Sequence, residues 1–148
     1  MADRITVTLH HLISLMDSYA DEMLTSRHGV TFSQFQFLAA VADLQPVDIT
    51  TLAKCLFVSK AAVSKRVPSL VADGWLVTSD DPQHGRRVLL TLTPRALALV
   101  VQAGGGLDDQ FTELFADPRL VAEGVDVGRL NRQLEILMDL VTEKGIPQ

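Results

Sequence analysis

Cysteine, aromatic residues and long apolar runs are all scarce in this sequence. The single cysteine, Cys55, excludes an intrachain disulfide. No apolar run is long enough to cross a bilayer, and the first residues lead into a polar-interrupted helix rather than a secretory signal, so we expect a cytoplasmic protein without membrane contact. Aromatic residues make up 5% of the chain although 47% of it is hydrophobic. That mix favours a mainly helical protein, and 148 residues suffice for a single domain, 1–148.

The residue groupings on which enzymes depend are also missing. No paired carboxylates share a face near a base, and no serine, histidine and aspartate occur in a triad context. The glycines at 104–106 follow a predicted helix rather than a strand, so they do not resemble a phosphate-binding loop. His10, His11 and His28 have no cysteine or acid at convincing ligand spacing, and we interpret them as surface or hydrogen-bonded histidines. We therefore expect no enzyme activity, no metal and no cofactor.

Residues 48–74 contain two short predicted helices joined by a turn of a few residues. Asp48 is a candidate N-cap for the first helix, whose apolar positions recur at helical spacing until Phe57-Val58. Ser59 is a candidate N-cap for the second helix, because its hydroxyl can accept from the unpaired N–H groups of the first turn. Gly74 is a candidate left-handed residue at the end of the second helix. This spacing predicts a helix-turn-helix.

The second of these helices is predicted to have one apolar stripe, made by Val63, Val67 and Leu70. The remaining face is small, polar and basic, and it contains Lys60, Ala61, Ser64 and Lys65. Such a face suits a helix in the major groove of DNA, where short side chains allow close approach and polar ones meet base edges or phosphates. Pro68 lies inside the same helix, so we expect a kink or break after Ser64.

A basic hairpin is predicted next. Trp75–Thr78 has the composition of a strand, residues 80–85 that of a turn, and residues 86–92 that of a returning strand. Arg86 and Arg87 then lie at the hairpin tip, where we expect phosphate or minor-groove contact. His84 in the predicted turn is a candidate for phosphate contact or pH sensing, or else an exposed histidine without a role.

The charge is distributed unevenly along the chain. The net charge is −5, which is unexpected for a protein that binds DNA. Residues 54–95, however, hold seven basic and three acidic residues, a local charge of +4. The remainder holds six basic and fifteen acidic residues, a local charge of −9. A basic stretch in an acidic chain is compatible with phosphate contact, because only nearby charges act strongly through salt.

Helices are also predicted on both sides of the central stretch. The first covers residues 4–28 and ends at Gly29, and the second follows a possible capping box of Thr31 and Gln34 to about residue 44. Residues 45–47 are predicted to be a linker.

After the hairpin, Thr93-Pro94 predicts the start of another helix. Each glycine at 104–106 costs a helix interior roughly 1 kcal/mol relative to alanine, so we expect a bend or weak point there. Asp117-Pro118 predicts a stop, and the last helix is expected at about 126–143.

The wing residues resemble a known family, the MarR transcriptional regulators of bacteria. The family's wing signature is D-x-R-x-x-x-x-x-L-T-x-x-G, and this chain has His84, Arg86, Leu92, Thr93 and Ala96 at those places. Arg86, Leu92 and Thr93 match, whereas a histidine replaces the acid that helps to hold the wing and an alanine replaces the glycine. The preceding two-helix unit is similar to that of the family as well, so the resemblance covers residues 48–96.

The resemblance implies a mainly α fold with a small β-hairpin wing. We expect residues 31–96 to form a winged helix-turn-helix DNA-binding lobe and residues 1–29 and 97–148 to form dimerisation helices. It further implies a homodimeric repressor on an inverted-repeat operator in double-stranded DNA. Release by a small aromatic effector or by oxidation is expected, although Cys55, with apolar neighbours, is expected to be a buried, inert thiol rather than a sensor.

Two functional hypotheses follow from these residues. In the first, the protein regulates transcription and contacts DNA through nine positions: Ser59, Lys60, Ala61, Ser64, Lys65, Arg66, His84, Arg86 and Arg87. Arg66 is ambiguous, because it suits either a phosphate contact or an ion pair at the edge of the lobe. In the second, the chain is a winged-helix protein-interaction module without DNA binding, which Pro68 supports if it breaks the reading helix.

Overall fold

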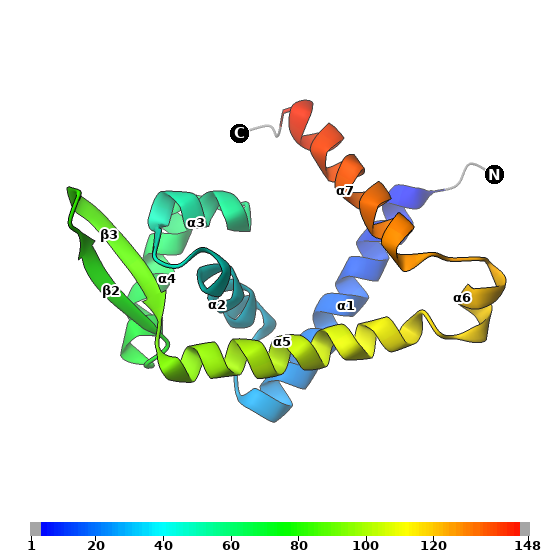
Figure 1. Cartoon of the computed structure of the whole chain (residues 1–148), viewed down its shortest axis with the longest axis horizontal. Coiled ribbons are helices and arrows are strands. Elements are labelled where there is room, and N and C mark those ends of the chain that lie inside the picture. The colour runs from blue at the N-terminus through cyan, green and yellow to red at the C-terminus, as the bar shows by residue number, and fades with distance from the viewer. Residues whose placement is uncertain (1–3, 146–148) are drawn as a thin grey trace. The chain divides into compact units, whose positions relative to one another are not determined.

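The structure is a computed structural model that describes residues 4–145. Its elements in chain order are α1 (Ile5–His28), α2 (Phe32–Leu44), β1 (Val47–Asp48), α3 (Ile49–Leu56), α4 (Lys60–Ala72), β2 (Leu76–Asp81), β3 (His84–Leu92), α5 (Pro94–Leu114), α6 (Pro118–Ala122) and α7 (Val127–Glu143). The chain forms two compact units, one up to Leu107 and one from Asp108 onward. The first unit contains the helix-turn-helix and the wing (Figure 1). The prediction of a mainly α fold with a small β-hairpin is confirmed.

The strands form one antiparallel sheet in the order β1-β3-β2. Strand β1 was not foreseen, because residues 45–47 were expected to be a linker. Val47 instead pairs with Leu90 of β3 and is 3% exposed. The linker prediction was therefore wrong at Val47. A strand of two residues is too short to show the alternation of apolar and polar residues by which strands are predicted.

The wing is longer than the sequence predicted. Strands β2 and β3 continue through Asp81 and from His84, so the turn is Pro82-Gln83 rather than residues 80–85. The Asp81 carboxylate accepts from the Gln83 N–H at 2.9 Å, which favours a tight turn. The pairing register shifts between Asp80 and Asp81, so an irregularity lies next to the tip. Figure 1 shows the tip of the hairpin extending away from the helices of the first unit.

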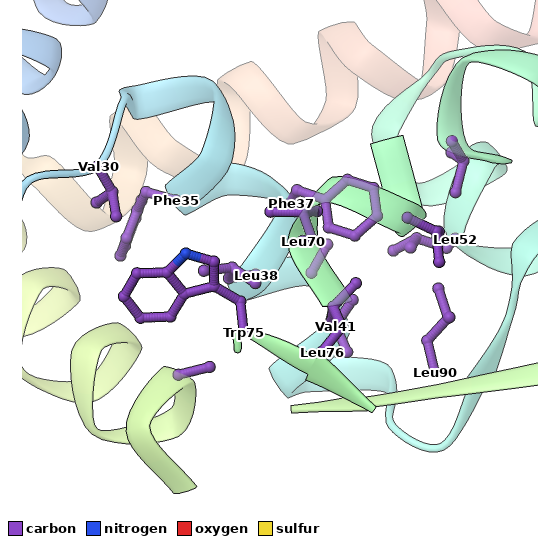
Figure 2. Close-up of a cluster of buried hydrophobic side chains, with 14 of the residues drawn as sticks. Val30, Phe35, Phe37, Leu38, Val41, Leu52, Leu70, Trp75, Leu76 and Leu90 are labelled. Carbon is purple, nitrogen blue, oxygen red and sulfur yellow. The ribbon is translucent and has the colours of Figure 1, made fainter. Parts of the chain in front are cut away.

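The core of the first unit joins its helices to the sheet (Figure 2). Leu38 of α2, Leu52 of α3 and Leu90 of β3 are each 0% exposed. On α4, the stripe Val63, Val67 and Leu70 is buried as predicted. The stripe's burial fixes the rotation of α4 and leaves its polar face in solvent.

Local capping sets the ends of the helices largely as predicted. Thr31 and Gln34 form the expected capping box at the start of α2. Helix α4 ends in a Schellman arrangement, in which Gly74, at φ +78°, donates to the Val71 carbonyl and Trp75 donates to the Leu70 carbonyl. Because these bonds satisfy the last carbonyls of α4, the chain turns directly into β2.

Pro68 does not break α4, which is helical without interruption from Lys60 to Ala72. The expected break was therefore wrong, while a kink after Ser64 stays a prediction. Proline removes one backbone donor and crowds the preceding turn, at a cost of about 3 kcal/mol. Val67 and Leu70, on either side of it, are both buried in the core, and their burial offsets that cost.

The glycine run does not interrupt α5 either, because the helix continues through residues 104–106 to Leu114. Ala103 beside the run is 1% exposed, and a Cβ placed on Gly104 would lie 3.6 Å from Phe35 Cζ of α2. Packing at Ala103 and Gly104 therefore holds this part of α5 against α2, whereas a Cβ on Gly105 or Gly106 would meet no atom within 4 Å. The run directly precedes the boundary between the two compact units.

In the second unit, Asp117-Pro118 begins a short helix instead of only ending one. Asp117 caps α6 by accepting from the Arg119 N–H, and its carboxylate forms an ion pair with the Arg119 guanidinium at 2.8 Å. The hydrogen bonds from Arg119 lower the pKa of Asp117 below its ordinary value. Phe111 and Phe115 pack edge to face, with ring centroids 5.5 Å apart. Helix α7 begins after the Asp126 cap, close to its predicted start.

A single threonine links the wing, the end of α4 and the start of α5, and its loss should be measurable. The Thr93 hydroxyl donates to the Gly74 carbonyl at 2.8 Å and accepts from the Ala96 N–H at 3.2 Å. Thr93→Val keeps the shape but removes both bonds, so we predict a loss of about 1 to 2 kcal/mol in the free energy of unfolding. Urea denaturation at one protein concentration measures it.

Thr91→Val is the matched control, because the Thr91 hydroxyl makes only a long 3.5 Å contact with the Val77 carbonyl. It should change the free energy of unfolding by less than about 0.5 kcal/mol. Equal losses in the two variants would contradict the role assigned to Thr93.

Candidate nucleic-acid interface

The start of α4 presents a continuous exposed surface. All residues from Phe57 to Ala62 are exposed, and the first buried position after them is Val63. The Ser59 hydroxyl caps α4 by accepting from the Ala62 N–H at 3.1 Å. Four predicted site residues, Lys60, Ala61, Ser64 and Lys65, are exposed on this helix.

Arg66, in contrast to these exposed residues, contacts another helix. Its guanidinium donates to the Ser33 carbonyl at 3.0 Å and lies over the Phe37 ring at 4.9 Å, so it connects α4 to α2. Burial lowers the pKa of Arg66 below its ordinary value, without making it neutral at physiological pH. These contacts are neither the phosphate contact nor the ion pair between which the sequence left a choice. Its assignment as a DNA contact stays an untested prediction.

On the wing, the three predicted residues have different surroundings. His84 and Arg86 are exposed on β3, and His84 lies in a strand opposite Asp81 rather than in the turn. Arg87 forms an ion pair with Asp48, with Nη1 3.4 Å from Oδ2. Within residues 4–145, the ion pairs join Arg87 to Asp48 and Arg119 to Asp117, so Lys60, Lys65 and Arg86 keep their charges unpaired.

Asp48 connects three elements near this surface. Its carboxylate caps α3 by accepting from the Thr51 N–H at 2.6 Å, its backbone belongs to β1, and its side chain pairs with Arg87 of β3. The hydrogen bonds from Thr51 lower the pKa of Asp48, and the charges of Arg87 and Lys60 act in the same direction. Sequence reasoning found the cap but not the ion pair, because Asp48 and Arg87 are far apart in the sequence and only the β1–β3 pairing brings them together.

Cys55 is exposed on α3, which corrects the expectation of a buried thiol. Leu52, three residues earlier on nearly the same side of α3, is 0% exposed, so Cys55 lies at the solvent-exposed edge of the face that Leu52 buries. Residues 4–145 contain no group of three or more metal-ligating side chains, and the absence of a metal stays a prediction. The same part of the chain has no helix that is both long and apolar enough to span a membrane.

The fold and this surface define a winged helix-turn-helix protein. Independent comparison agrees, since the model of the MarR family matches residues 28–87. The multiple antibiotic resistance protein MarR of Salmonella typhimurium is 27% identical over 99 residues, which is 65% of this chain and 69% of the relative.

Solved structures share the fold over nearly the whole chain. The transcriptional regulator BldR from Sulfolobus solfataricus has a TM-score of 0.77 at 20% identity, with 92% of this chain and 93% of that one covered. A complex of S. aureus MepR with DNA has a TM-score of 0.73 at 18% identity, with coverage of 94% and 96%. The chain therefore has the winged helix-turn-helix fold of these structures, and its residues 28–87 are similar to the MarR family.

The Asp48 carboxylate, mainly through the hydrogen bonds from Thr51 and to a smaller extent through its ion pair with Arg87, should make part of the protein's stability depend on pH. The folded pKa of Asp48 is lowered, so its contribution to stability is complete above its unfolded pKa of 3.8 and is lost as the pH falls through the lower folded value. Asp48→Asn keeps a capping oxygen but not the charge. We predict a loss of less than about 1 kcal/mol at pH 7 that shrinks toward zero as the pH falls below 4.

Denaturation by urea at several pH values measures this difference. Asp80→Asn on β2 is the control, because Asp80 is exposed and belongs to no ion pair within the described chain. A difference between wild type and Asp48→Asn that grew at acid pH would contradict the assigned role of the carboxylate.

Proposed function

We propose that this protein is a sequence-specific transcriptional regulator that represses by binding, as a homodimer, to an inverted-repeat operator in double-stranded DNA. The observation that carries the proposal is the exposed basic face at the start of α4, whose lysines form no ion pair within residues 4–145, together with the exposed Arg86 of the wing. Recognition helices contact base edges with their N-terminal residues, which here are the exposed ones. The S. aureus MepR complex with DNA, which has the same fold, supports the same use of the fold here.

The two basic positions are proposed to contact different parts of the DNA. Ser64 and Lys65 project from α4, so they would meet base edges in the major groove. Arg86 on the wing would meet the flanking phosphates or the minor groove. Arg87 is proposed to act less directly, because its guanidinium is already paired with Asp48.

Exposed apolar residues on the terminal helices support the homodimer. Helix α1 exposes Leu12, Ile13, Leu15 and Met16, and α7 exposes Ile136, Leu137, Met138, Leu140 and Val141. Patches of this kind on a soluble regulator mark interaction surfaces. A second copy of the chain would cover them and would present two α4 helices to one operator, in the cytoplasmic location expected from the sequence.

The proposal also includes control of DNA binding by an effector or by oxidation. The MarR resemblance suggests a small aromatic ligand, and the exposure of Cys55 gives an oxidant access to the thiol. Release of the protein from DNA by benzoate, compared with release by peroxide in wild type and Cys55→Ser, separates the two routes.

The protein-interaction hypothesis loses its main support in the structure. It depended on Pro68 disrupting the reading helix, whereas α4 is unbroken. We therefore retain DNA binding as the proposed function.

A charge on the apolar stripe of α7 should weaken the dimer. Leu137→Lys places a charge where the proposed interface excludes water, so we predict a shift toward the monomer by light scattering at micromolar concentration. Asn131→Lys is the control, since Asn131 is an exposed polar residue on the same helix and bonds to Glu135. A wild-type protein that is monomeric under these conditions would remove the homodimer from the proposal.

Salt titration of DNA binding should separate the roles of α4 and the wing. Lys65→Ala should cost about 1 to 3 kcal/mol on the preferred duplex and relax the preference at one base position. Arg86→Ala should weaken binding to specific and scrambled duplexes alike, and should reduce the salt slope of log K by roughly 0.9 per subunit.

Arg27→Ala is the matched control for lost positive charge, because Arg27 is exposed on α1 outside the basic stretch. It should leave affinity and slope unchanged. An Arg86→Ala variant with wild-type slope and wild-type affinity for scrambled duplexes would refute the wing assignment.

A further inference from the structure

Phe57, in the turn between α3 and α4, combines two unfavourable features. Its backbone is left-handed, with φ +55° and ψ +40°, and among residues 4–145 it is the one non-glycine residue with positive φ. This conformation is uncommon for a bulky side chain, which collides there with the backbone. The side chain is also 69% exposed, so the ring gains little from burial in the fold.

The backbone at this position needs the left-handed conformation but not the ring. The Phe57 N–H donates to the Lys54 carbonyl at 3.2 Å, and the Val58 N–H donates to the Ala53 carbonyl at 3.1 Å, which together close α3. Glycine would make the same bonds without steric cost. The aromatic side chain is therefore not explained by the turn, and strain of this kind at an exposed position points to function.

The position of Phe57 indicates what the ring contacts. It begins the exposed run that continues through the Ser59 cap into Lys60 and Ala61, the N-terminal residues of α4. Exposed Lys54 and Lys60 flank it in the sequence. Those lysines favour a phosphate-rich partner over an apolar protein groove, and the N-terminal residues of a recognition helix are the ones nearest the base edges.

We propose that Phe57 is a specificity-determining residue that packs on the C5-methyl group of a thymine at the edge of the half-site. This inference rests on the proposed DNA-binding function. Apolar contact with the thymine methyl is one of the direct ways in which a protein distinguishes A·T from other base pairs in the major groove. The binding contact, rather than the fold, then accounts for an aromatic ring at a left-handed position.

The test compares thymine with deoxyuridine, which lacks only the methyl group. In a duplex that the wild-type protein binds specifically, each thymidine is replaced by deoxyuridine, one position at a time. One symmetry-related pair of replacements should weaken wild-type binding by roughly three- to ten-fold. Phe57→Gly should bind the thymine duplex more weakly than wild type and should no longer distinguish thymine from deoxyuridine at that position.

A measurement of stability distinguishes the loss of the thymine contact from misfolding of the variant. Phe57→Gly relieves the left-handed strain, so its urea denaturation midpoint should equal or exceed that of wild type while its specific binding falls. Phe57→Tyr should retain the thymine preference, because it keeps the ring. Val71→Ala, a change at an exposed apolar residue near the other end of α4, should leave the preference as in wild type.

The outcomes distinguish this inference from the proposed function. If wild type binds specifically but Phe57→Gly discriminates between thymine and deoxyuridine as wild type does, the thymine contact is refuted and the regulator remains. If Phe57→Gly loses affinity equally for all duplexes and wild type ignores every methyl group, the ring contacts the sugar-phosphate backbone and the specificity role is wrong. If wild type prefers no duplex, the proposed function fails and this inference with it.

Discussion

Burial of the Val63, Val67 and Leu70 stripe is the constraint on which the rest of the first unit depends. These side chains attach α4 to a core that includes α2, α3 and β3, and so determine which residues of α4 face solvent. The Ser59 cap fixes where the helix begins, and the bonds around Gly74 fix where it ends. The polar face is thus a consequence of apolar packing on the opposite side.

The wing depends on the same core through long-range contacts. Leu90 is fully buried and pairs with Val47, so β3 is held against β1 as well as β2. The Asp48–Arg87 ion pair adds a charged contact close to that pairing. In the family signature an acid stands where this chain has His84, and Asp48 supplies an acid to the wing from another element. Arg86 is left exposed beside it.

Local signals explain most of what the sequence could predict. Caps such as Thr31, Asp48 and Ser59 act on donors three residues away, and the stripe of α4 has a period that can be read directly. The errors arose where distant residues decide the outcome. Packing against the core overrides the propensity of Pro68, and β1 exists only because β3 pairs with it. Within the candidate site, the contacts of Arg66 and Arg87 could not be predicted without the fold. Phe57 could not be recognised as unusual without its backbone conformation.

We propose that α4 and the wing read a symmetric DNA site. Selection of bound duplexes from a random pool by the wild-type protein tests it most directly, because the method assumes no operator. We predict enrichment of an inverted repeat whose half-site centres are about one helical turn, roughly 34 Å, apart. A pool that shows no sequence enrichment after selection, or an enriched motif without two-fold symmetry, would contradict it.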